Sequence, residues 1–124
     1  MIVADTNLIV GLTAKDPMSV AVHAKDEDWV APQIWQSEMR SALLGLMRAG
    51  RITNNTAVEM FQVATRTVQT FESSTPAVLR LAEAHGLTAY DAEFAALAEW
   101  LQISAVSFDD DLLSQGLAIH PKNF

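Results

Sequence analysis

Hydrophobic and polar positions along the chain follow two patterns, short apolar or β-branched runs and longer stretches with helical spacing. Residues 2–5, 29–31 and 105–107 are short apolar runs, typical of strands buried on both faces, and residues 67–71 are β-branched and aromatic. The clearest helical pattern runs from Gln33 to Ala49, and the Gly50 that follows suits a helix C-terminus. Strands that alternate with helices predict parallel pairing.

The fold class follows from the order of these elements. With 124 residues, half of them hydrophobic, the chain is the size of one domain with an adequate core. We therefore expect a single domain over residues 1–124, a three-layer α/β/α sandwich with a short, mostly parallel central sheet. The predicted order is strand 2–5, helix 7–12, helix 17–25, strand 29–31, helix 33–49, a helix capped by Thr53 or Asn54, strand 67–71, helix 76–85, a helix from 89 or 91 to 101, strand 105–107, helix 109–115 and an edge strand 117–119.

Four acidic residues, Asp5, Glu38, Asp91 and Asp109, are the candidate functional groups. Asp5 ends one predicted strand, Asp109 comes shortly after another, and Asp91 opens a predicted helix. Each aspartate taken alone has a simple structural explanation, because an acid at a helix N-terminus caps it or complements its dipole. Glu38 differs, since it lies inside a helix beside an apolar stripe. A solvated helix edge remains an alternative for Glu38.

Taken together, the four acids predict a metal site. Ligands bind beyond the carboxyl ends of the strands in an open parallel sheet. Clustered carboxylates repel one another, and a hard divalent cation such as Mg²⁺ removes that cost. Nearby polar residues would support the cluster: Thr6 and Ser107 add hydroxyls, and Asn7 can hold a carboxylate in place.

Charge and composition limit the functions open to the chain. The net charge of −7 has the wrong sign for an ordinary nucleic-acid binder. Either nucleic acid is not the partner, or a bound metal and a partner protein supply positive charge. The chain has no cysteine, no basic segment at its start and no apolar run of membrane-spanning length, so we expect a cytoplasmic protein without a membrane partner.

Other kinds of site have little support in the sequence. His23, His85 and His120 are scattered without metal-ligand spacing or a paired nucleophile. The chain contains no P-loop, no dinucleotide-binding fingerprint and no nucleophile elbow. A phospho-receiver domain fits the length but not the residues, because Asp5 has no adjacent acid and no strand-end lysine occurs near the C-terminus.

Four segments resemble the acidic motifs of PIN-domain nucleases, in order and over essentially the whole chain. The first resembles the opening strand of that family, and the last has Ser107 where threonine is usual. Asp110 is a departure, since a basic residue is frequent at that place. The four segments are Val3–Asn7, Gln36–Leu43 around Glu38, Leu87–Glu99 around Asp91, and Val106–Asp109.

The resemblance implies a small ribonuclease, the toxin of a VapC-type toxin–antitoxin pair. Such proteins use one or two Mg²⁺ or Mn²⁺ ions, form homodimers and are inhibited by a cognate antitoxin. The resemblance carries over Asp5, Glu38, Asp91 and Asp109 as catalytic and metal-binding acids, with Asp111 as a further metal ligand. RNA would be the substrate.

A second reading keeps the acids but makes the chain a catalytically weak protein-binding module of the same fold. The low basic content favours it, whereas the presence of all four acids favours the enzyme. Arg40, Arg48 and Arg51 are the candidates for phosphate contacts, with simple solubilising charge as the alternative for each. Apolar residues beyond the needs of a small core predict an exposed apolar surface for a homodimer and an antitoxin: Trp35, Met39 or Met47, and Leu101.

Overall fold

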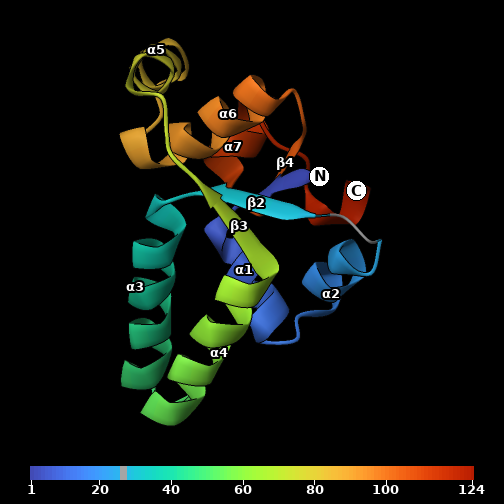
Figure 1. Ribbon diagram of the computed structural model, residues 1–124, viewed down its shortest axis with the longest axis vertical. Helices are drawn as coiled ribbons and strands as arrows, with labels where there is room; N and C mark the ends of the chain where they lie inside the picture. The colour runs from blue at the N-terminus through green and yellow to red at the C-terminus, as the bar shows by residue number, and fades with distance from the viewer. Residues whose placement is uncertain (26–27) are drawn as a thin grey trace.

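The computed structural model describes residues 1–25 and 28–124. Within them, four short strands form one sheet in the order β3-β2-β1-β4, and every neighbouring pair is parallel (Figure 1). The strands are β1 (Ile2–Ala4), β2 (Trp29–Pro32), β3 (Val68–Phe71) and β4 (Ala105–Val106). The predicted parallel sheet is confirmed.

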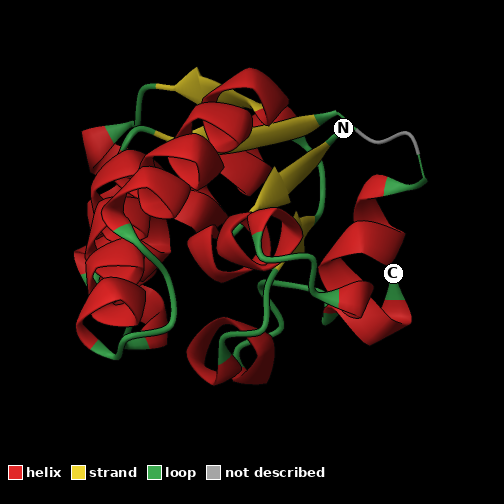
Figure 2. Cartoon of the chain, turned by 90° about the horizontal axis from the view of Figure 1, so that it is seen from below, coloured by secondary structure: helices red, strands yellow, loops and turns green. Residues whose placement is uncertain are grey.

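Helices cover both faces of the sheet (Figures 1 and 2). On one side lie α1 (Thr6–Thr13), α3 (Ile34–Arg48) and α4 (Asn54–Thr67), with α2 (Pro17–His23) beside α1. On the other side α6 (Ala89–Leu101) lies against the sheet, and α5 (Thr75–His85) and α7 (Asp110–Ser114) pack against α6. The α/β fold class is therefore confirmed. None of the described helices is long and apolar enough to cross a bilayer.

The core forms where the strands meet these helices. Ile2, Val3 and Val30 are almost completely buried, as expected for a sheet covered on both faces. From α3, Trp35 and Met39 reach the same core with no exposed surface. The prediction that these two residues contribute to an exposed apolar surface is therefore wrong. Their helical spacing places them on the buried face of α3.

The predicted edge strand 117–119 is wrong in extent. Ile119 forms one isolated parallel bridge with Val106, in which its N–H donates to the Ala105 carbonyl at 2.8 Å. The chain then enters a 3-10 helix, η1 (Pro121–Asn123), for which His120 is the N-cap. Proline has no N–H to continue a ladder, so the pairing ends there. The remaining elements match the prediction to within a few residues at each end.

The strand order places a switch point beside β1. The chain proceeds from β1 to β2 and β3 on one side, and β4 returns to pair on the other side. Ligands of open parallel sheets bind at the carboxyl ends of the strands where the order reverses. Asp5 follows β1 directly, and Ser107 and Asp109 follow β4. The topology thus brings residues from the two ends of the chain to one place.

Candidate metal centre

Asp5 joins β1 to α1 and is the most buried of the four acids, with 6% of its surface exposed. It caps α1, because one carboxylate oxygen accepts the Thr6 N–H at 2.8 Å. The other oxygen accepts a hydrogen bond from the hydroxyl of Ser107. The capping role considered for Asp5 is therefore real, but a cap alone does not require burial or a second donor from another strand. Both oxygens are held in fixed positions.

Ser107 connects Asp5 to the loop that carries Asp109. Its hydroxyl is fully buried, donates to Asp5 and accepts the Asp109 N–H at 2.9 Å. Nearby, the Asn7 side-chain oxygen accepts the Phe108 N–H at 3.3 Å. These contacts join the start of α1 to the segment after β4. The predicted supporting residues Ser107 and Asn7 therefore each accept a backbone N–H, and Ser107 also donates to the carboxylate of Asp5.

Glu38 reaches the same place from α3. Its carboxylate accepts the Thr6 hydroxyl at 2.7 Å, and the side chain is partly buried. Thr6 thus donates its N–H to Asp5 and its hydroxyl to Glu38. A solvated helix edge, the alternative for Glu38, is excluded by this contact.

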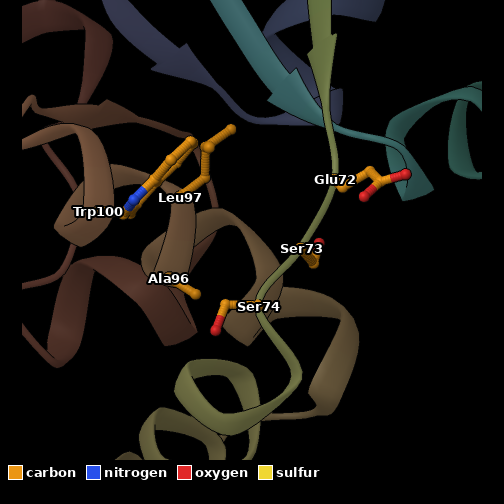
Figure 3. Close-up of a pocket in the computed structure, with 6 residues that line it drawn as sticks. All are labelled: Glu72, Ser73, Ser74, Ala96, Leu97 and Trp100. Atoms are coloured by element: carbon orange, nitrogen blue, oxygen red, sulfur yellow. The ribbon is translucent and has the colours of Figure 1, made fainter.

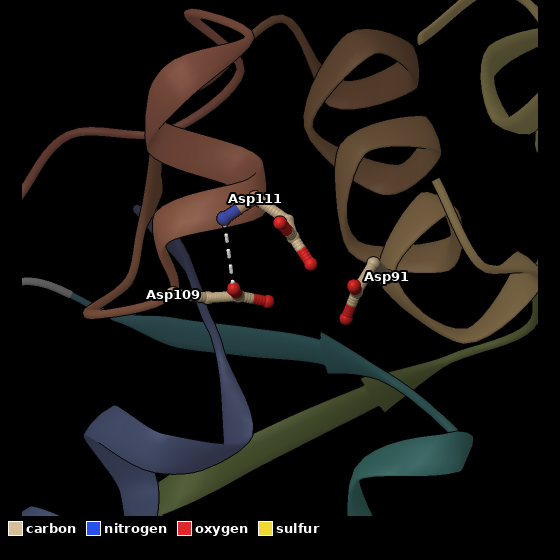
Figure 4. A group of neighbouring side chains, drawn as sticks. All are labelled: Asp91, Asp109 and Asp111. Carbon is tan, nitrogen blue, oxygen red and sulfur yellow. Dashed lines mark hydrogen bonds between the residues drawn. The ribbon is translucent and has the colours of Figure 1, made fainter. Parts of the chain in front are cut away.

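Asp91, Asp109 and Asp111 form the other side of the centre. Asp91 lies in the first turn of α6, where its N–H donates to the capping Thr88 hydroxyl at 3.1 Å. Asp109 caps α7 by accepting the Asp111 N–H at 3.0 Å. One carboxylate oxygen from each of the three aspartates lies within 4.8 Å of the others. Figure 4 shows the three side chains pointing toward one another.

A cavity of about 370 Å³ lies among these residues. Its wall contains all four predicted acids together with Thr6, Asn7, Val10 and Ala42. Asp111 is not part of this lining but belongs to the aspartate trio, while Asp110 is exposed and belongs to neither set. The lining does not include Arg40, Arg48 or Arg51, so the residues described around this cavity offer no phosphate contact from those arginines.

The carboxylates affect one another's protonation. Burial raises the pKa of Asp5 from its ordinary 3.8 to about 6, against the lowering effect of its bonds from Ser107 and Thr6, and the charges of Glu38 and Asp109 add to the rise. Burial also raises the pKa of Asp91 to about 6, helped by the charges of Asp109 and Asp5. The pKa of Glu38 is raised by burial and by the charges of Asp91, Glu93 and Asp109.

Glu93 is an acid that the sequence analysis missed. It lies two residues after Asp91 on α6, its charge raises the pKa of Glu38, and it accepts the Ser73 hydroxyl at 2.5 Å. The signal available in the sequence was a second acid near the start of the helix that carries Asp91. Because positions two apart face different sides of a helix, that signal was weak.

The donor set fits a hard divalent cation. The charged groups around the cavity are carboxylates, and oxygen is the donor that Mg²⁺ and Mn²⁺ prefer. The raised pKa values of Asp5 and Asp91 record repulsion and burial that a cation would offset. One oxygen each from Asp91, Asp109 and Asp111 lies close enough to the others to share such an ion, whereas Asp5 and Glu38 line the same cavity without belonging to that trio.

Comparison with known proteins adds independent information about the family. The family model described as "PIN domain" matches residues 2–116. A search of curated proteins found no match.

Several solved structures share the fold. The structure of PAE2754 from Pyrobaculum aerophilum has a TM-score of 0.81 and 24% identity, and the match covers 98% of this chain and 89% of that one. A toxin-antitoxin complex from Klebsiella pneumoniae has a TM-score of 0.74 and 16% identity over 100% of both chains. FitAcB from Neisseria gonorrhoeae has a TM-score of 0.64 and 19% identity, also over 100% of both chains.

Proposed function

This chain belongs to the PIN domain family, and from that premise we propose that it is a metal-dependent ribonuclease, the toxin of a VapC-type toxin–antitoxin pair. One observation carries the proposal. Asp5, Glu38, Asp91 and Asp109 come from four separate elements and line a single cavity at the switch point of the sheet. The structural similarity to a toxin-antitoxin complex supports the toxin assignment.

We assign different roles to the buried and the partly exposed carboxylates. Asp5 and Glu38 are fixed by hydrogen bonds from Thr6 and Ser107, so they would present their carboxylates to an ion from set positions. Asp91 and Asp109 are partly exposed and can also orient a water molecule toward a phosphate that enters the cavity. One or two Mg²⁺ or Mn²⁺ ions, when bound, supply positive charge at the phosphate and acidify water.

The expected products follow from the attacking group. If water attacks the phosphorus, the ribose 2′-OH takes no part in cleavage. The products then carry 5′-phosphate and 3′-OH ends, without cyclic phosphates. None of the histidines His23, His85 and His120 is among the residues that line the cavity, as expected for cleavage without imidazole acid–base catalysis.

The test is cleavage of single-stranded RNA by the purified protein with Mg²⁺ or Mn²⁺, followed by analysis of the product ends. We expect 5′-phosphate ends, loss of activity in EDTA and a loss of orders of magnitude in rate for Asp91→Asn. Asp110→Asn is the control, because it also removes one carboxylate charge but from an exposed position next to Asp109, and it should keep activity. Full activity of Asp91→Asn would contradict the proposed site.

A groove between α3 and α4 is the place we assign to the antitoxin. It has a volume of about 560 Å³ and an apolar lining that includes Leu43, Met47 and Phe61, with Arg40 at its wall. Four of the eight basic residues of this acidic chain lie between positions 34 and 67, against two acids. An amphipathic segment with acidic residues would complement both the apolar lining and this charge.

We further propose a homodimer in the cytoplasm. Large apolar side chains remain exposed on the single chain, including Leu79 at 60% and Met18 at 46%. Light scattering over a range of micromolar concentrations tests the dimer, and a constant monomer mass would contradict it.

The alternative function is a protein-binding module with little nuclease activity. The net charge of −7, with no basic residue in the lining of the acidic cavity, favours it. The cleavage assay separates the two functions. An inactive wild-type protein that still binds an antitoxin through the α3–α4 groove would establish the binding module.

A further inference from the structure

Helix α6 carries a row of side chains along one side that the proposed catalytic site does not use, exposed at its two ends and buried at Leu97, which is 3% exposed. Tyr90, Glu93, Leu97 and Trp100 are separated by three, four and three positions, a spacing that places them on one side of a helix. Tyr90 is 59% exposed and Trp100 is 67% exposed. We refer to these four residues as the α6 stripe. It begins next to Asp91, within the proposed metal centre.

A cavity of about 280 Å³ lies at the Trp100 end of the stripe. Leu97 and Trp100 form its α6 wall, and Ser73 and Ser74, from the segment after β3, form the opposite wall (Figure 3). The Ser73 hydroxyl donates to Glu93, which ties that wall to α6. The indole ring of Trp100 meets the ring of Phe71 edge-on, with centroids 6.2 Å apart. The exposed ring is therefore supported on one side by Phe71.

The chemistry of this cavity suits a nucleobase. The indole offers a flat face for stacking, as unpaired RNA bases require. The Ser74 hydroxyl, which makes no capping bond to α5, can donate or accept at a base edge. The lining contains no lysine or arginine, so it offers no charged contact to a phosphate.

We propose that the α6 stripe binds the unpaired bases of a single-stranded RNA that flank the phosphate in the metal centre. One base stacks on Tyr90, and another occupies the cavity at Trp100, about 15 Å further along the helix axis by the rise of 1.5 Å per residue. The proposal rests on the ribonuclease function. It gives a physical account of how a chain of net charge −7 holds RNA, through stacking on bases in place of contacts to phosphates.

Tryptophan fluorescence provides a direct test. Trp29 and Trp35 are 2% and 0% exposed, so iodide quenching reports Trp100. The titration uses short single-stranded RNA with Ca²⁺ in place of Mg²⁺, and a gel shows that the RNA stays intact. We expect RNA to protect Trp100 from iodide and to change its emission. A duplex of the same sequence, whose bases are already stacked, should have neither effect.

Three variants and one control test the contact between the stripe and RNA. Trp100→Leu removes stacking and should weaken RNA binding about fivefold or more, and Tyr90→Leu should do the same. Trp100→Phe keeps an aromatic face and should retain most of the affinity. Val63→Ala removes an exposed apolar side chain from α4, away from the stripe, and should leave binding unchanged. With Mg²⁺, the two leucine variants should raise KM and keep kcat, because neither residue holds the ion.

Each contrary result has a distinct meaning. If RNA is cleaved in Mg²⁺ but leaves the iodide quenching of Trp100 unchanged, the α6 stripe proposal is wrong and the ribonuclease function stands. If the wild type neither binds nor cleaves single-stranded RNA, the ribonuclease function is wrong. If Trp100→Leu turns a dimer into a monomer with unchanged RNA affinity, the stripe is a self-association surface and the proposal is overturned.

Discussion

The hydroxyl of Ser107 donates a hydrogen bond to the carboxylate of Asp5, although 102 positions separate them in the sequence. The same oxygen accepts the N–H of Asp109. One buried side chain thus sets the distance between two acids of the candidate metal centre. It also joins the segment after β1 to the segment after β4, the two strands that flank the switch point.

Removal of this hydroxyl should destabilise the protein. Ser107→Ala leaves a buried carboxylate oxygen of Asp5 and the N–H of Asp109 without their partner, at a cost of about 1–3 kcal/mol in the free energy of unfolding. Urea unfolding measures the difference. Ser41→Ala, an exposed position on α3, is the control and should be neutral or slightly stabilising. Equal effects of the two substitutions would show that the Ser107 contacts contribute nothing.

The metal-free protein should lose stability as the pH rises from about 4 to 6. Asp5 has a pKa of about 6 in the folded protein against an ordinary 3.8, so in this range the folded state binds more protons than the unfolded state. The full effect of such a shift is on the order of 3 kcal/mol. Unfolding in EDTA across this range measures it, with the raised pKa values of Asp91 and Glu38 acting in the same direction.

Asp5→Asn isolates the contribution of that carboxyl group, because every other titrating group remains. We expect the variant to show a weaker fall in stability with pH than the wild type. The amide oxygen can still accept the Thr6 N–H, and the amide NH2 can donate to the Ser107 hydroxyl oxygen, so the fold should persist. Identical pH dependence in the two proteins would mean that Asp5 titrates normally.

Divalent metal should raise the melting temperature. A ligand that binds only the folded state stabilises it by about 2.7 kcal/mol at one hundred times its Kd. We expect Mg²⁺ or Mn²⁺ to stabilise the wild type and to stabilise Asp5→Asn and Asp91→Asn much less. Asp110→Asn is the matched control, since it removes one charge from an exposed position outside the centre. If Asp110→Asn lowers the metal-induced rise in melting temperature as much as Asp5→Asn does, the metal acts by neutralising surface charge in general.

Substitution of two valines of α4 should have different effects on antitoxin binding in the α3–α4 groove. Val58 lines the groove and is 49% exposed, whereas Val63 is 42% exposed and is not part of the lining. Val58→Asp should weaken binding of the antitoxin and relieve inhibition of the nuclease, because it places a charge on an apolar contact. Val63→Asp should do neither. Titration calorimetry with the antitoxin and the RNA cleavage assay measure both effects, and equal weakening would place the contact elsewhere.

The sequence by itself determined the elements and the identity of the acids. Strand runs and capping residues are local signals, so Thr53 or Asn54 was readable as a helix start, and the structure has Thr53 as the cap. The resemblance of four short segments was also sufficient to identify the PIN family, since the family model matches residues 2–116. The catalytic and metal-binding roles of these acids remain predictions.

The tertiary structure alone decided which side chains meet and which remain exposed. No spacing in the sequence indicated that Ser107 would reach Asp5, or that Thr6 would bridge Asp5 and Glu38. Nor could residue type separate Trp35, fully buried under the sheet, from Trp100, exposed on the outer face of α6. Periodicity shows which residues share a face of a helix, whereas the packing of the layers decides which face is covered.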